Sequence, residues 1–395
     1  MDIPASVNKQ RIRSIDLLRG LVMIIMALDH TRDFFHATAF TGNPLDPTTT
    51  TVWLYFTRWI THFCAPTFVF LAGTSAFLQG LRKNKKELSR FLITRGVWLI
   101  LVEVIIINLA YFFDPTYATI GLQTIWAIGI SMVILGLFIW LPFYVILLAG
   151  LAIVFGHNML DIYEKAHPVY SVWYAILHRP GLFPYTENFK LFVVYPFLSW
   201  SGLMMVGYCF GKLLTNAQGM KRKNLLIWVG LAVTVFFFAL RAANIYGDPG
   251  RWTNDGNPLH FIYSFLNTQK YPPSLLYMSM TIGPSILFLA FFDKAKGKLV
   301  EIISVYGRVP FFYYILHFYL IHVISSITFF LRGHGMKDDI PQNPLDPYFV
   351  IPGEGFSLPI VYLFWLFIVI SLYPVCKWYD KYKMDHKENK FLSYL

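Results

Sequence analysis

About ten long apolar segments, most of them close to 20 residues in length, alternate with short polar segments along this chain. A helix rises about 1.5 Å per residue, so a run of that length crosses the ~30 Å hydrocarbon core of a bilayer. The segments are 17–35, 53–79, 92–113, 119–139, 141–156, 191–213, 225–243, 274–292, 308–331 and 357–377. Charged residues make up only 14% of the chain, against roughly 25% in soluble domains, which excludes an ordinary soluble enzyme. We therefore predict an all-α integral membrane protein, with residues 1–395 forming a single transmembrane domain of about ten helices.

Two details of these segments are less regular. Only Trp140, Leu141 and Pro142 separate the fourth segment from the fifth, with Pro142 as the sole break. Pro66 lies inside the long segment 53–79 and is expected to kink it, because proline removes a backbone hydrogen bond.

The distribution of basic residues predicts the topology. Lysine and arginine concentrate in the N-terminus, the loops 80–91, 212–224 and 293–298, and the C-terminus. The intervening loops 36–52, 114–118, 157–190, 244–272 and 332–356 contain fewer of them. With ten helices every basic segment falls on one side, so the positive-inside rule places both termini in the cytoplasm. We expect a multi-pass protein of the cell inner (cytoplasmic) membrane, with 157–190, 244–272 and 332–356 as outer loops.

The net charge of +11 does not require a nucleic-acid partner. The basic residues lie in short runs beside apolar segments, where the anionic headgroups of the lipid bilayer neutralise them. The three cysteines (Cys64, Cys209 and Cys376) lie in or beside apolar segments without metal-ligand spacing, so we interpret them as packing residues and predict no metal site.

The first segment carries an unusual group of ionisable residues. Asp29, His30, Arg32 and Asp33 lie within five positions at its far end, and His30 lies roughly 20 Å along the helix from Leu17. Ionisable groups at such depth face a bundle interior or a water-filled cavity. The same cluster argues against cleavage of the segment as a signal peptide, because the charges would lie just before the cut. We therefore predict a functional site around His30 in the outer half of the bilayer.

Other polar residues could reach the same depth from other segments. Asn108, Asp114 and Gln123 lie towards the outer end of the third and fourth segments, and His322 lies about 18 Å along the ninth. An outer-half pocket formed by the first, third, fourth and ninth helices is the resulting prediction. At the opposite end of the first helix, Asp16 and Arg19 are three residues apart and can pair as helix neighbours.

Several motifs resemble the heparan-α-glucosaminide N-acetyltransferase family and its bacterial relatives. They are RIRSIDLLRG (11–20) leading into ALDHTRD (27–33), FCAPTFVFLAGTS (63–75), QTIWAIG (123–129), YPPS (271–274) and VPFFYYILHFYLIH (309–322). The resemblance covers nearly the whole chain, and the first and second helices together are its most specific part. It implies a membrane acyltransferase that takes acetyl from cytosolic acetyl-CoA and delivers it to a sugar across the membrane. His30 matches the functional histidine of the family. The segment after His30 differs, so heparan itself is not implied as acceptor.

The chemistry of the residues agrees with this activity. A thioester is already activated, so the enzyme must mainly remove a proton from an amine or hydroxyl, which a neutral imidazole does well near pH 7. We assign His30 as general base, with Asp29 or Asp33 orienting it and Arg32 balancing charge; an acetyl-histidine intermediate is the alternative route. Gln123 or Asn108 would stabilise the oxyanion, and Asp114 and His322 complete the predicted acceptor pocket. The CoA phosphates are expected at the basic face, with these candidate ligands: Arg19, Arg82, Lys83, Arg90 and Arg95.

Two other functions remain open at this stage. A proton-coupled secondary transporter also uses intramembrane Asp, Glu and His, although no repeated halves are visible in the sequence. A non-catalytic membrane scaffold leaves the residues from Asp29 to Asp33 unexplained. The sequence does not give the oligomeric state, and a homodimer is compatible with it.

Overall fold

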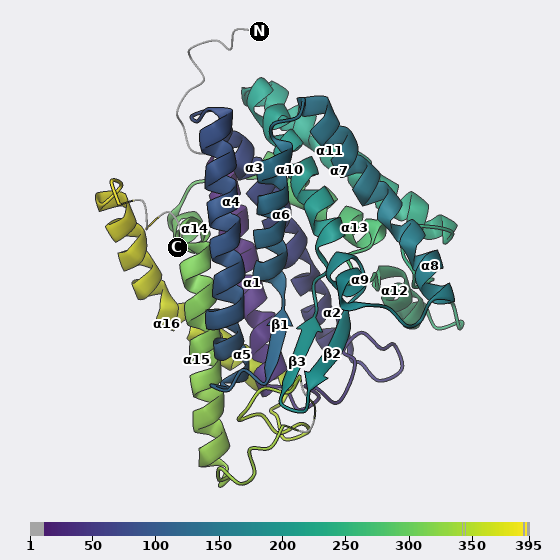
Figure 1. The fold of residues 1–395 in the computed structure, drawn as a ribbon, viewed down its shortest axis with the longest axis vertical. Helices are drawn as coiled ribbons and strands as arrows, with labels where there is room; N and C mark the ends of the chain where they lie inside the picture. The colour runs from purple at the N-terminus through teal and green to yellow at the C-terminus, as the bar shows by residue number, and fades with distance from the viewer. Residues whose placement is uncertain (1–11, 342, 344, 390–391, 393–395) are drawn as a thin grey trace.

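The computed structural model describes residues 12–341, 343, 345–389 and 392. Most of the basic N-terminus and the last few C-terminal residues, which the topology prediction also used, lie outside the described residues. Long helices run roughly side by side through the molecule (Figure 1). The helical elements are α1 (Arg13–Phe35), α2 (Val52–Ile60), η1 (Thr61–Phe63), α3 (Cys64–Gly80), α4 (Lys85–Val102), η2 (Glu103–Ile107), α5 (Asn108–Phe112), α6 (Thr124–Phe138), α7 (Phe143–Gly156), η3 (His157–Met159), α8 (Leu160–Ala166), α9 (Val172–Leu177), α10 (Phe197–Asn216), α11 (Gly219–Ala243), α12 (Pro258–Leu266), α13 (Leu275–Phe291), α14 (Lys298–Arg308), α15 (Pro310–Leu331) and α16 (Leu358–Asp385).

Seven helical spans in the described residues are long and apolar enough to cross a membrane. They are Val52–Gly80, Lys85–Phe112, Phe143–Ala166, Phe197–Asn216, Gly219–Ala243, Pro310–Leu331 and Leu358–Asp385. The other three predicted segments correspond to α1, which is rich in charge, and to the shorter helices α6 and α13. The protein is therefore a mostly helical, multi-pass membrane protein, while the count of ten crossings and the side of the termini stay predictions.

The helix breaks follow local chemistry. α6 ends at Phe138 and α7 begins at Phe143 after Pro142, so these two helices are separate, as predicted. The long second segment divides into α2 and α3 at the 3₁₀ turn η1 (Thr61–Phe63), just before Pro66. The break precedes the proline because its ring excludes the carbonyl four residues earlier from a helical hydrogen bond.

A small sheet replaces the ends of two predicted helices. β1 (Thr119–Leu122) pairs in parallel with β3 (Phe189–Val193), and β3 pairs antiparallel with β2 (Gly181–Thr186), giving the order β1-β3-β2. The first residues of the predicted helices 119–139 and 191–213 are therefore strand, so the purely α-helical prediction was wrong at these positions. The sheet lies towards the same end of the molecule as the 332–356 loop, at the bottom of Figure 1. The predicted topology makes this the outer end.

α1 lies at the centre of the bundle, in contact with α3, α13, α14, α15 and α16. Its closest neighbour is the short helix α14, which runs past its first turns. A Cβ atom on Gly20 would lie 1.9 Å from the carbonyl oxygen of Ile303, and one on Gly307 would lie 1.8 Å from that of Asp16. These two glycines let the backbones of α1 and α14 touch.

Replacing Gly307 by valine is therefore expected to destabilise the protein. The added side chain must push α14 away from α1, and overpacking of this kind costs about 1–3 kcal/mol. A lower apparent melting temperature in detergent, monitored by tryptophan fluorescence, is the measurement. Gly156→Ala at the end of α7 is the control, because a Cβ at that glycine meets nothing within 4 Å. Equal melting temperatures for the two variants would contradict the prediction.

Candidate functional site

The imidazole of His30 lies in an aromatic recess formed by α15. Its ring centroid is 4.3 Å from that of Phe318, 5.3 Å from that of His317 and 6.5 Å from that of Tyr314. The Nδ1 atom of His30 is shielded from solvent and has no hydrogen-bond partner among the described residues. An imidazole nitrogen in this state can accept a proton from a substrate group without first breaking a contact within the protein.

The charged neighbours of His30 form a compact ionic cluster. Asp29 accepts from Arg32 at 3.1 Å, forms an ion pair with Arg58, and lies 3.8 Å from the ammonium of Lys270. Arg32 also contacts Asp33 at 2.5 Å. Asp29 therefore contacts three cations, and Asp33 contacts Arg32. Because Arg32 contacts both carboxylates, it can balance their charge. Among the described residues neither carboxylate is hydrogen-bonded to His30, so Asp29 contacts the cations instead of orienting the ring.

Sequence reasoning missed Arg58 and Lys270. Arg58 interrupts an otherwise apolar stretch of α2, and this position was the available signal. Lys270 directly precedes the YPPS motif, and its ammonium also lies 5.2 Å from the centre of the Tyr271 ring. Burial raises the pKa of the Tyr271 phenol, but the nearby Lys270 and Arg58 cations outweigh it and hold the pKa below its ordinary value. The loop before α13 therefore adds the Lys270 ammonium and the Tyr271 phenol to this region.

A second feature is a cavity of about 270 Å³ nearer the beginning of α1. Its walls are mostly apolar and come from α1, α3, α4, α6 and α15; they include Met23, Met26, Phe68, Leu99, Ile128 and Phe311. Four cationic side chains also line it: Arg19, Arg95, Arg308 and Lys383. A mostly apolar recess with a few charged groups is typical of a small-molecule site, in which the charges fix the orientation of the ligand.

The cavity arginines are held by identifiable contacts. Arg19 donates to the carbonyl oxygen of Leu71 at 3.0 Å and to the hydroxyl of Ser75 on α3. Arg308 donates to Asp380 at 2.7 Å and to Glu301 at 2.7 Å, which anchors the end of α14 to α16. These contacts pre-orient guanidinium groups, whose planar donor geometry suits phosphate oxygens.

Tyr314 joins the two features. It lines the cavity, and its ring is the edge-on neighbour of the His30 ring. Along α1 the cavity begins at Arg19 and continues to Met26, one helical turn before His30. Arg19 and His30 are thus separated by about 16 Å along the axis of α1. Tyr314 thus lies between the cation-lined cavity and the His30 ring, which does not itself line the cavity.

The wall of the cavity beside α6 depends on Glu103. This residue is fully buried at the start of the π-helical turn η2, and its Oε2 accepts from the backbone N–H of Trp126 at 3.0 Å. A carboxyl oxygen at this position accepts from an N–H group in the first turn of α6, which has no partner within the helix. Because Thr124 and Ile125 line the cavity, Glu103 helps to shape its deep end.

The predicted CoA ligands divide into two groups. Arg19 and Arg95 line the cavity, whereas Arg82, Lys83 and Arg90 do not. Arg82 and Arg90 are exposed. Lys83 lies 5.5 Å from the centre of the Phe91 ring, which itself lines the cavity. The two cations that sequence reasoning did not select, Arg308 and Lys383, come from distant parts of the chain.

The predicted acceptor residues mainly support the backbone. Asn108 donates to the carbonyl oxygens of Glu103 and Gly121 and accepts from the N–H of Gly121, so both of its amide hydrogens are engaged. Asp114 accepts from the backbone of Thr116 and Ala118.

The other two acceptor candidates lie at helix and loop junctions. The ring nitrogens of His322 lie 2.9 Å from the carbonyl oxygens of Ala110 and Tyr348. His322 therefore joins α15 to α5 and to the 332–356 loop. Gln123 is the N-cap residue of α6, beside the cavity residues Thr124 and Ile125.

One comparison with known proteins identifies a family. Residues 11–246 match the family model described as "Heparan-alpha-glucosaminide N-acetyltransferase, catalytic". No curated protein matches the chain. The matched region includes α1 with His30 and two of the four cavity cations, Arg19 and Arg95.

Proposed function

We infer the function from the family: the chain belongs to the heparan-α-glucosaminide N-acetyltransferase family, whose members are transmembrane acetyltransferases. We propose that the protein moves an acetyl group from cytosolic acetyl-CoA to an amine or hydroxyl of a glycan on the outer side of the membrane. The observation that carries the proposal is the contact between the two features of the site. A cation-lined cavity ends at Tyr314, and Tyr314 lies against the imidazole of His30.

The cavity suits the donor in both charge and polarity. Arg19, Arg95 and Arg308 offer guanidinium groups for the phosphates of CoA, in the geometry that phosphate prefers. The apolar walls suit the uncharged pantetheine arm. A volume of about 270 Å³ holds that arm but not the whole of CoA, so the nucleotide end lies at the cationic opening.

The chemical step needs one base and one leaving group. His30 Nδ1 removes the proton from the acceptor amine or hydroxyl. At the same time the nitrogen or oxygen atom of the acceptor attacks the thioester carbonyl. The C–S bond then breaks, CoA leaves as a thiolate, and the proton held by His30 neutralises it. Gln123 is the better of the two predicted oxyanion donors, because the amide hydrogens of Asn108 are already engaged. Transfer through an acetyl group on His30 itself uses the same geometry in two steps.

We place the acceptor at the outer end of the helices, beside His30. The ionic cluster of Asp29, Arg32, Arg58 and Lys270 lies beside His30, and the sheet and outer loops lie at the same end of the helices. We place the protein in the cytoplasmic membrane, with the cation-lined cavity open to the cytoplasm and the acceptor arriving from outside.

Thermal unfolding in the presence of CoA tests the donor site. A ligand that binds only the native protein stabilises it by about 2.7 kcal/mol at a hundred times its Kd, so saturating CoA is expected to raise the melting temperature by several degrees. Pantetheine, which lacks the nucleotide phosphates, is the matched control ligand and is expected to stabilise less. The absence of any response to millimolar CoA would contradict the proposal and would favour a transporter.

A further inference from the structure

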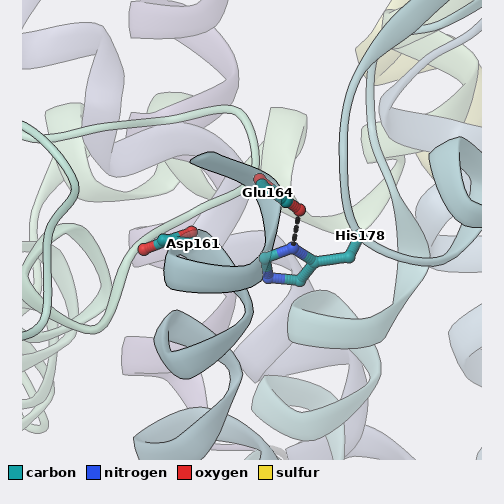
Figure 2. A group of neighbouring side chains, drawn as sticks. All are labelled: Asp161, Glu164 and His178. Atoms are coloured by element: carbon teal, nitrogen blue, oxygen red, sulfur yellow. Dashed lines mark hydrogen bonds and ion pairs between the residues drawn. The ribbon is translucent and has the colours of Figure 1, made fainter. Parts of the chain in front are cut away.

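A group of possible metal ligands lies away from the site described above, at the junction of α8 and α9. Asp161 and Glu164 are three residues apart on α8, so they share one face of that helix. His178 immediately follows α9. One ligand atom from each residue lies within 4.8 Å of the others. Figure 2 shows Glu164 and His178 in direct contact, with Asp161 to one side of them. The set combines two carboxylates with one imidazole.

The described residues balance the charges of this group only in part, through the ion pair between Glu164 and His178. Asp161 is 8% exposed and His178 is 0% exposed, and the Glu164 side chain is 13% exposed. Within the described part of the chain, neither carboxylate forms an ion pair with lysine or arginine. The neighbouring Arg179 donates instead to the backbone oxygen of Glu164 at 3.4 Å, and its guanidinium lies over the ring of Tyr170. The imidazole of His178 can balance one of the two largely buried carboxylates and leaves the other without a cation among the described residues.

Both ring nitrogens of His178 have a partner, and a cation that binds Nδ1 would take the place of its hydrogen bond with Glu164. His178 Nδ1 faces Glu164 Oε1 at 2.6 Å, and its Nε2 lies 3.1 Å from Nδ1 of the buried His157. When Nδ1 binds a cation, Nε2–H donates to His157, and a second partner of this kind fixes the tautomer and the ring. In that arrangement His157 carries its own proton on Nε2, a buried atom that has no partner among the described residues.

The second carboxylate is oriented in the same way. The side-chain amide of Asn158 donates to Asp161 Oδ2 at 2.8 Å, which leaves the other carboxylate oxygen of Asp161 available. The side-chain Oδ1 of Asn158 accepts from the backbone N–H of Leu275 at 2.9 Å. This hydrogen bond connects the group to the beginning of α13. The β2–β3 hairpin follows His178 directly along the chain. A cation here would therefore join α8, α9 and α13 on the outer side.

We propose that Asp161, Glu164 and His178 bind a divalent transition-metal cation that holds the 157–190 loop in place. The nitrogen and oxygen donor set suits Zn²⁺ or Mn²⁺ better than Ca²⁺, which prefers oxygen alone. Ligand atoms around a tetrahedral Zn²⁺ lie about 3.3 Å apart, given bonds of about 2.0 Å, so only small rotations of the two carboxylates are needed. This metal site was not predicted from the sequence, because a turn and a second helix separate His178 from the two carboxylates on α8. The proposal is independent of the proposed acetyltransferase activity.

Calorimetric titration of the chelator-treated, full-length protein with Zn²⁺ in lipid nanodiscs tests this site. We expect one equivalent to bind to the wild type. His178→Ala is expected to weaken binding at least 100-fold, and His157→Gln, which alters the supporting partner, about 10- to 100-fold. Co²⁺ provides a second readout, because the visible spectrum reports four-coordinate binding. His260→Ala is the matched control: His260 pairs with Asp255 at 2.8 Å and is expected to leave Zn²⁺ affinity unchanged.

Glu164→Gln keeps the proposal falsifiable if His178→Ala fails to fold. The glutamine can still accept from His178 but loses the charge, so it is expected to weaken Zn²⁺ binding while preserving the fold. Failure of the wild type to bind Zn²⁺ stoichiometrically would overturn the proposal. So would preference for Ca²⁺ over Zn²⁺, or binding that the His178 and Glu164 variants leave unchanged.

Discussion

Replacement of His30 by alanine is expected to lower the rate of acetyl transfer by about 100- to 10,000-fold, the usual contribution of a positioned general base. The variant removes a ring nitrogen that has no hydrogen-bond partner among the described residues, so little of the surrounding structure depends on it. The aromatic neighbours of the ring are Phe318, His317 and Tyr314. The variant is therefore expected to lower kcat and to leave the stability of the fold nearly unchanged.

The measurement uses purified protein in nanodiscs, radiolabelled acetyl-CoA and glucosamine as a probe acceptor. A CoA-dependent rise in melting temperature that matches the wild type would establish that the His30→Ala protein is folded and binds the donor. His322→Ala offers a contrast, because the ring of His322 joins two backbone segments and its removal is expected to lower stability. Undiminished transfer by folded His30→Ala protein would refute the assignment of the base.

The second large effect is expected at the donor end, in the Arg95→Ala variant. A hydrogen bond to a charged group contributes about 1.5–3 kcal/mol, so losing a guanidinium–phosphate contact should raise KM for acetyl-CoA roughly 10- to 100-fold. Because Arg95 lines the cavity and is not among the ring neighbours of His30, kcat should change little. Initial rates at varied acetyl-CoA concentrations separate the two constants.

Two other residues on α4 make this test specific. Lys86 is exposed near the start of the helix, and Lys86→Ala is the control that keeps KM at the wild-type value. Arg90 is also exposed and does not line the cavity. If Arg90→Ala and Arg95→Ala raised KM equally, the phosphates would bind across the surface of α4, and the cavity would not be the donor site.

Helix positions could be predicted from the sequence because the bilayer imposes a simple requirement. An apolar run must be long enough to cross the hydrocarbon, and its length is visible in the sequence. The separation of α6 from α7 at Pro142 was predicted in the same way. The strands β1 and β3 were missed because Thr119–Leu122 and Phe189–Val193 are apolar and run into helices. Their pairing depends on each other, across about 70 residues of chain, and no local pattern reports it.

The ionisable residues of α1 were also visible in the sequence, since charge inside an apolar segment is conspicuous wherever it occurs. Their partners were not. Asp29 contacts Arg58 and Lys270, and the cavity gains Arg308 and Lys383, only because distant segments fold against one another. His178 likewise lies near the carboxylates of α8 only in the folded structure, because a turn and α9 separate them along the chain.

The sequence by itself thus determined a membrane-embedded helical protein with a histidine and charges deep in its first helix, because hydrocarbon thickness and the energetic penalty for buried charge act on each segment separately. Only the tertiary structure decided which charges meet and where a cavity remains. Those outcomes depend on how closely helices approach, and contacts such as that of Gly307 with the backbone of Asp16 set this distance.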